Sequence, residues 1–100
     1  MKLQLVVRRQ VEADIAAAAA WYRQQSPTTS DRFVRVVRES LLLIEQNPFQ
    51  YQIAFGQYRK AVLRPFPYLL VYKTTKTEIV VVACTHGHRH PKRWQERARK

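Results

Sequence analysis

The spacing of apolar side chains in the first half of the chain predicts two helices. Apolar residues first recur every three or four positions, at Val11, Ile15, Ala18 and Tyr22. This helix should end near Gln25, because the following Ser26-Pro27 pair breaks a helix. A second amphipathic helix, with Ser30 as its N-cap, should continue to the stop signal Asn47-Pro48. Its apolar stripe consists of Phe33, Val36, Val37, Ser40, Leu41 and Ile44. The short connection makes the pair an antiparallel hairpin.

The second half changes to a period of two, which predicts strands. An aromatic loop is expected at residues 48–56, and a separate short strand is expected at residues 2–7. Three strands should follow the loop, at Tyr58–Arg64, Tyr68–Lys73 and Glu78–His86. The last of these is apolar on both faces, with Ile79, Val81 and Ala83 opposed to Val80, Val82 and Cys84. A strand of that kind is expected at the centre of a sheet.

The element order is therefore one strand, two helices, three strands and a short basic C-terminal helix that Pro91 opens. This β-α-α-β-β-β order predicts an α+β fold in which a helical hairpin packs on an antiparallel sheet. One hundred residues correspond to a single domain, residues 1–100. The pattern leaves the neighbour of the first strand open.

Charge narrows the function more than composition does. Eighteen Lys and Arg against seven Asp and Glu give a formal net charge of +11, and most of the excess lies in residues 57–100. A small domain this basic is typical of proteins that meet polyanions such as nucleic acid or an acidic protein. A hydrophobic content of 46% excludes a disordered chain. One alternative at this point is a plain nucleic-acid-binding module.

The single cysteine and the N-terminus bear on the compartment. Cys84 has no partner for an intrachain disulfide, which fits a reducing cytoplasm. The N-terminus lacks the long apolar run of a signal peptide, and the apolar run Ile79–Cys84 is too short for a membrane span. We therefore expect a cytoplasmic protein without a membrane role.

Two segments of the basic half resemble a known family. Arg64–Tyr72 has the pattern R-x-F-P-Y-x-x-x-Y, and the stretch from His86 to Trp94 has the pattern H-x-x-R-x-P-x-x-W. Ala13-Asp14-Ile15, Ala20-Trp21-Tyr22, Arg32-Phe33 and Ile44 with Asn47-Pro48 are similar to the helical hairpin of the same family. The order and spacing of these motifs resemble the RelE/ParE superfamily of bacterial type II toxins, which includes plasmid stabilisation proteins.

The resemblance implies a growth-inhibiting toxin that a cognate antitoxin neutralises. RelE-like members cut mRNA in the ribosomal A site without a metal, whereas ParE-like members poison DNA gyrase and are not known as nucleases. A ribosome-dependent endonuclease must move a proton from the ribose 2′-OH and stabilise the phosphorane charge. The candidate residues for that chemistry are His86, Arg89, Arg64 and Lys60. His86 would shuttle the proton, and the cations would hold phosphate.

Two positions depart from the nuclease pattern. RelE-like members carry a basic residue just after the aromatic that begins the middle strand, and this chain has Leu69 there. They also often carry a C-terminal Tyr or His, where this chain has Trp94, whose indole does no acid–base work. We therefore expect a ParE-like toxin that acts by binding gyrase rather than as an enzyme, with the mRNA endonuclease and a non-toxic nucleic-acid-binding module as alternatives.

A binding toxin needs surfaces for its target and for its antitoxin. The basic run after the third strand is the expected target-binding surface, with Arg89, Lys92, Arg93, Trp94 and Arg97 as its residues. Trp21 and Tyr22 on the first helix are expected either to pack on the sheet or to contact the antitoxin.

Three histidines raise the question of a metal. In an extended chain His86, His88 and His90 share one face. Structural zinc sites take four ligands, and the first carboxylate that follows in sequence is Glu96. We expect no metal site and no cofactor.

Overall fold

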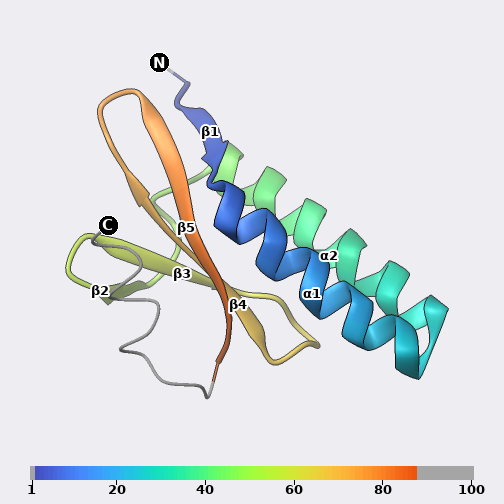
Figure 1. Cartoon of the computed structure of the whole chain (residues 1–100). Helices are drawn as coiled ribbons and strands as arrows, with labels where there is room; N and C mark the ends of the chain where they lie inside the picture. The colour runs from blue at the N-terminus through green and yellow to red at the C-terminus, as the bar shows by residue number, and fades with distance from the viewer. Residues whose placement is uncertain (1, 88–100) are drawn as a thin grey trace.

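The protein is an α+β fold of two layers, a helical hairpin and a five-stranded sheet (Figure 1). The computed structural model describes residues 2–87. Helices α1 and α2 lie side by side along one face of the sheet. The expected C-terminal helix lies outside the described residues. The elements are β1 (Gln4–Val7), α1 (Arg9–Gln25), α2 (Pro27–Gln46), β2 (Ile53–Phe55), β3 (Tyr58–Val62), β4 (Tyr68–Thr74) and β5 (Glu78–His86).

The start of α2 differs from the expectation. Ser26 is the N-cap, with its hydroxyl accepting a hydrogen bond from the Thr29 main-chain N–H, and Pro27 is the first helical residue. The proline that ends α1 therefore also opens α2, because its fixed φ suits the first turn and it has no N–H to leave unpaired. Ser30, expected as the cap, is instead inside the helix and buried.

The α2 stripe is confirmed. Phe33, Val37, Ser40 and Ile44 are buried, and Val36 and Leu41 pack at the edge of the same core. Helix α1 presents Val11 and Ala18 to that core, with Ile15 and Tyr22 partly buried beside them. The small alanine side chains let the two helices approach closely, and the Ser30 hydroxyl reaches the Ala19 carbonyl oxygen at 2.8 Å.

The sheet order is β1-β5-β4-β3-β2. β5 pairs in parallel with β1 and antiparallel with β4. The first strand and the last strand of the described chain are therefore neighbours, and the helical hairpin follows β1 in the sequence before the other strands. β2 is an addition to the expected strands. It lies within the segment expected as a loop, and a tight turn at Gly56, with φ at +52°, folds it back onto β3. Glycine adopts that backbone conformation without a steric penalty.

A β-bulge changes which face two residues of β5 occupy. Val71 pairs with Ala83, but the next residue of β4, Tyr72, pairs with Val81, so Val82 is an extra residue in β5. Such an insertion reverses the alternation that follows it. Cys84 therefore joins Ile79 and Val81 on the helix side, and Ala83 joins Val80 and Val82 on the other side. The expected assignment of Ala83 and Cys84 was wrong for this reason.

Both faces of the central strands are covered by apolar contacts, as expected for β5. We call the sheet face toward the helices the inner face and the opposite one the outer face. On the inner face, Leu70, Tyr72 and Ile79 pack with the helical stripes. On the outer face, Tyr58, Val71, Val80, Val82 and Ala83 form a second buried cluster. Within residues 2–87, no helix is long and apolar enough to cross a membrane.

Candidate functional site

The end of β5 is held by the start of β4. His86 is the last residue of β5 and pairs across the sheet with Tyr68, the first residue of β4. Their rings meet edge to face with centroids 5.5 Å apart. The following main-chain N–H, of Gly87, donates a hydrogen bond of 2.6 Å to the Pro67 carbonyl oxygen. The chain therefore leaves the sheet at a point fixed by one ring contact and one hydrogen bond.

The turn between β3 and β4 is anchored in the core. Its Leu63 N–H donates to the Tyr68 carbonyl oxygen at 2.9 Å, and its Phe66 N–H donates to the Leu63 carbonyl oxygen at 2.8 Å. Phe66 is buried, with its ring centroid 5.0 Å from that of Tyr22 and 5.2 Å from that of Phe33. Arg64, in the same turn, is exposed. The turn thus presents a cation to solvent on a rigid base.

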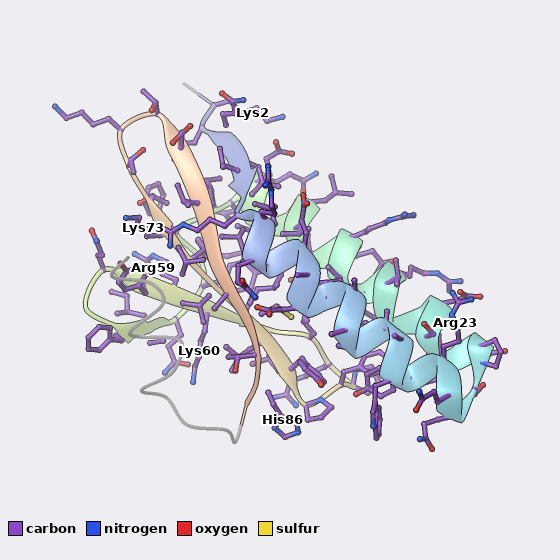
Figure 2. The ribbon with its side chains drawn as sticks, in the orientation of Figure 1. Lys2, Arg23, Arg59, Lys60, Lys73 and His86 are labelled. Carbon is purple, nitrogen blue, oxygen red and sulfur yellow. The ribbon has the colours of Figure 1, made fainter. Side chains whose placement is uncertain are left out.

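The structure does not bring Lys60 and His86 together on one face. Lys60 pairs with Val71, and Val71 pairs with Ala83, both of which belong to the outer cluster. His86 pairs with Tyr68, which packs against the inner core. Cross-strand partners share a face of a sheet, so Lys60 lies on the outer face and His86 on the inner one. Figure 2 labels both residues. Arg89 lies outside the described residues.

Leu69 occupies the position on the outer face where RelE-like members are expected to have a basic residue. Leu69 is partly buried against the outer cluster. Two cations of that face lie farther along the sheet: Lys60 is the cross-strand partner of Val71, and Lys73 comes four residues after Leu69, with its ammonium 6.0 Å from the centroid of the Tyr58 ring. Tyr58 itself is 7% exposed and stacks on Phe55 at 6.3 Å, so its ring is not open for a base to stack on.

The two aromatic residues of α1 have different surroundings. Trp21 is 55% exposed and touches the molecule edge-on through Tyr22, with ring centroids 5.1 Å apart. Tyr22 packs among Phe33, Phe66 and Tyr68. Burial, and then the neighbouring Tyr68, raise the pKa of Tyr22 above its usual value. Of the pair, Tyr22 therefore packs on the sheet, and Trp21 is left as a surface residue.

The sequence analysis did not predict the side-chain contacts that hold the loop between α2 and β2. We call the contacts that Arg59 makes with this loop the Arg59 clamp. Arg59 donates from Nη1 to the Tyr51 carbonyl oxygen at 2.6 Å and to the Phe49 carbonyl oxygen at 3.3 Å. Its guanidinium also lies 5.7 Å from the centroid of the Phe49 ring. The Tyr72 hydroxyl donates to the Pro48 carbonyl oxygen at 2.6 Å. An isolated arginine in an alternating strand carries no signal for such a role.

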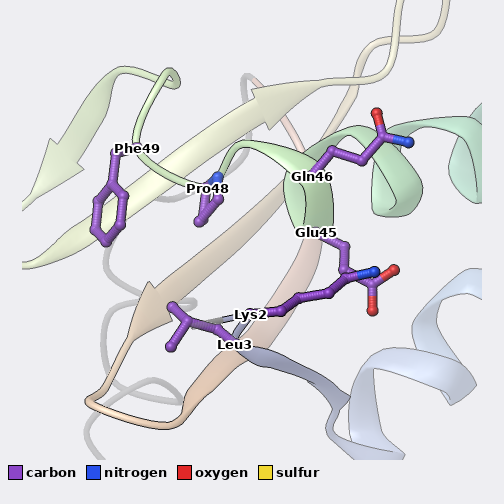
Figure 3. Close-up of a pocket in the computed structure, with 6 residues that line it drawn as sticks. All are labelled: Lys2, Leu3, Glu45, Gln46, Pro48 and Phe49. Atoms are coloured by element: carbon purple, nitrogen blue, oxygen red, sulfur yellow. The ribbon is translucent and has the colours of Figure 1, made fainter.

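A pocket of about 430 Å³ opens beside this clamp. It lies between the start of the chain, the end of α2 and the loop that follows (Figure 3). Its lining has a polar side with Lys2, Glu45 and Gln46 and an apolar side with Leu3, Pro48 and Phe49. Phe49 is 61% exposed, although its backbone is held by Arg59. The remaining sequence-expected residues, from His88 to Arg97, lie outside the described residues.

Comparison with known proteins agrees with this fold. A family model described as the ParE toxin of the type II toxin-antitoxin system, parDE, matches residues 5–91. The chain is 33% identical over 92 residues to Toxin ParE2 from two strains of Mycobacterium tuberculosis, CDC 1551 / Oshkosh and H37Rv, a match that covers 91% of this chain and 88% of each relative.

Two solved structures have the same fold. One is from the chromosomal ParDE TA system of P. aeruginosa, with a TM-score of 0.76 and 18% identity over 85% of this chain and 96% of the other. The second is from the YoeB dimer of Staphylococcus aureus, with a TM-score of 0.57 and 19% identity over 85% and 97% of the two chains. The fold and the motifs thus define a toxin of the RelE/ParE superfamily. Within it, the chain belongs to the ParE toxin family of type II toxin-antitoxin systems.

Proposed function

We propose that the protein inhibits growth by binding DNA gyrase in the cytoplasm and that a cognate antitoxin neutralises it. The observation that carries the proposal is the match of residues 5–91 to the ParE toxin family. The RelE/ParE resemblance links ParE-like members to gyrase and RelE-like members to mRNA cleavage. The target-binding residues are Arg89, Lys92, Arg93, Trp94 and Arg97, which follow β5 in the sequence.

The geometry of the described residues supports binding rather than RNA cleavage. A metal-free nuclease needs its proton-transfer group and its phosphate-binding cations around one scissile bond. Here Lys60 and His86 occupy opposite faces of the sheet, and Leu69 is packed in an apolar cluster. A binding toxin needs only a presented surface, and the end of β5 supplies a fixed starting point for the basic segment.

The antitoxin-binding surface of this proposal includes Trp21. Its indole is more than half exposed and makes an edge contact with Tyr22. Tryptophan is enriched among the residues that contribute most to binding at protein interfaces. Tyr22 would act beneath it as support.

The test measures supercoiling of relaxed plasmid by purified gyrase as a function of toxin concentration. A reconstituted translation reaction on a defined mRNA, with its 5′ ends mapped, runs beside it. We expect supercoiling to fall and the message to stay intact. Ribosome-dependent cuts within codons, with gyrase unaffected, would instead assign the protein to the mRNA endonucleases. His86, Arg64, Lys60 and Arg89 would then be the residues to substitute.

A further inference from the structure

The pocket at the end of α2 has a preformed apolar wall. The Pro48 carbonyl oxygen accepts a hydrogen bond from the Tyr72 hydroxyl at 2.6 Å, and the Phe49 carbonyl oxygen accepts one from Arg59 Nη1 at 3.3 Å. Leu3, on the same side of the pocket, packs against the inner core. Contacts within the protein therefore hold this wall in place. The volume of about 430 Å³ lies within the range of about 300–1,000 Å³ that is usual for small-molecule sites.

The polar side of the pocket carries one charge of each sign. Lys2 comes from the start of the chain and Glu45 from the last turn of α2 (Figure 3). Among the residues that the structure describes, no ion pair joins the two. A ligand with a single net charge would therefore meet one opposite and one like charge here, whereas a zwitterion satisfies both. This balance sets the pocket apart from the chain as a whole, whose net charge of +11 favours anions.

The end of α2 favours the positive group of a zwitterion. A helix C-terminus carries a partial negative charge, near which a cation is stabilised. The last turn of α2 has no basic residue of its own, and Glu45 adds a full negative charge that is partly shielded from water. A ligand ammonium is therefore expected at Glu45. Lys2, with the side-chain amide of Gln46, is left to donate to a carboxylate.

We propose that this pocket binds a free α-amino acid with a large apolar side chain. The ammonium of the amino acid contacts Glu45, its carboxylate contacts Lys2, and its side chain packs on the apolar wall that includes Phe49. Because the pocket joins the start of the chain to the end of α2, an occupied pocket stabilises the folded state by mass action. The proposal is independent of gyrase binding, since no residue of the pocket belongs to the proposed target-binding surface.

The test titrates the isotope-labelled full chain with L-phenylalanine and follows the backbone amide signals by NMR. Three further compounds each lack one feature: N-acetyl-L-phenylalanine lacks the ammonium, L-phenylalaninamide lacks the carboxylate, and glycine lacks the side chain. We expect saturable shifts with phenylalanine in the millimolar range, largest at the amides of Leu3, Gln46 and Phe49. Each of the other three compounds should bind more weakly, because each leaves one part of the pocket without a partner.

Two variants assign the charges. Glu45→Gln should weaken phenylalanine binding about tenfold, because a hydrogen bond to a charged group is lost. It should not weaken binding of N-acetyl-L-phenylalanine, which has no ammonium. Lys2→Gln should weaken binding of phenylalanine but not of the amide. Glu39→Gln is the matched control, because Glu39 is an exposed acid of the same helix outside the pocket. The melting temperature without ligand checks that each variant is folded.

Three results would overturn the proposal. The first is the absence of saturable shifts when the wild-type chain is titrated to tens of millimolar phenylalanine. The second is equal binding of phenylalanine and either singly charged analogue, which would show that the pocket recognises an apolar group with one charge, such as a peptide end. The third is an equal loss of affinity in Glu45→Gln and Glu39→Gln, which would show a general effect of charge.

Discussion

The Ser30 hydroxyl of α2 donates a hydrogen bond of 2.8 Å to the Ala19 carbonyl oxygen of α1, at a point where Ser30 is 1% exposed. The contact fixes the register of the helical hairpin with a side chain small enough to lie between two helices. Since Trp21 and Tyr22 lie two and three residues after Ala19 on the same helix, the same contact sets where the exposed indole lies relative to the core.

Replacement of Ser30 should therefore depend on size. Ser30→Ala loses one buried hydrogen bond and should lower the free energy of unfolding by about 1 kcal/mol. Ser30→Leu must force the helices apart, and overpacking of this kind costs roughly 1–3 kcal/mol or more. Urea unfolding followed by circular dichroism gives both values. A leucine variant as stable as the alanine variant would mean that the hairpin is not closely packed at this point.

Tyr72 should make stability fall in alkaline solution. Burial raises its pKa to about 12, with Arg59 lowering it and Tyr51 raising it by smaller amounts. The unfolded tyrosine ionises near pH 10, so between about pH 10 and pH 12 the unfolded state loses this proton and the folded state keeps it. The stabilisation from Tyr72 is thus complete below pH 10 and is lost as the pH rises toward 12.

Tyr72→Phe removes that group together with the 2.6 Å hydrogen bond to Pro48. At pH 7 the variant should be less stable by about 1 kcal/mol. The difference in the free energy of unfolding between wild type and variant, measured with urea, should become smaller from pH 9.5 to pH 11.5. A constant difference would place the folded-state pKa near that of the unfolded chain.

Arg59 should control how firmly the loop after α2 is held. Nη1 donates both of its hydrogen bonds, to the carbonyl oxygens of Phe49 and Tyr51, and the guanidinium lies 5.7 Å from the centroid of the Phe49 ring. Arg59→Lys keeps the charge but replaces the planar, weakly hydrated guanidinium with a flexible, strongly hydrated ammonium, so chymotrypsin should cut after Phe49 faster in the variant. Arg38→Lys, an exposed arginine of α2, is the control. Similar cleavage rates in the two variants would show that the loop is held by other contacts.

The basic segment should be separable from the fold. Removing residues 92–100, or substituting Arg89→Ala, should abolish growth inhibition, because both remove cations from the proposed gyrase-binding surface. Thermal unfolding should change little, since neither change alters an inner-core residue that the structure describes within residues 2–87. Full growth inhibition by both variants would reject this segment as the surface that meets the target.

Much of the fold follows from the sequence because long periodic stretches determine it. The α2 stripe and the central, two-sided character of β5 were predicted from apolar spacing. The bulge at Val82 was not, because small apolar residues fill both phases of β5 and nothing in their order favours one register. β2 was missed because three residues inside an aromatic segment are too few to establish an alternation.

The candidate site was less predictable. Sequence patterns brought His86, Arg64 and Lys60 into one group by their chemistry, but the face on which each lies depends on cross-strand register. The Arg59 clamp depends on the path of a loop ten residues earlier in the chain. Neither feature has a local signature. The helix start at Ser26-Pro27 does have one, because the same pair that ends the first helix is also a favourable N-cap and first residue for the second.

The most direct test of the central claim is made in cells that carry a reporter plasmid and express the protein from an inducible promoter. Plasmid topology and mRNA 5′ ends are measured from the same samples after induction and before growth stops. The account predicts loss of negative supercoiling or gyrase-dependent plasmid breakage, without new codon-phased mRNA ends. Growth arrest with normal plasmid topology and abundant cuts within translated codons would contradict it.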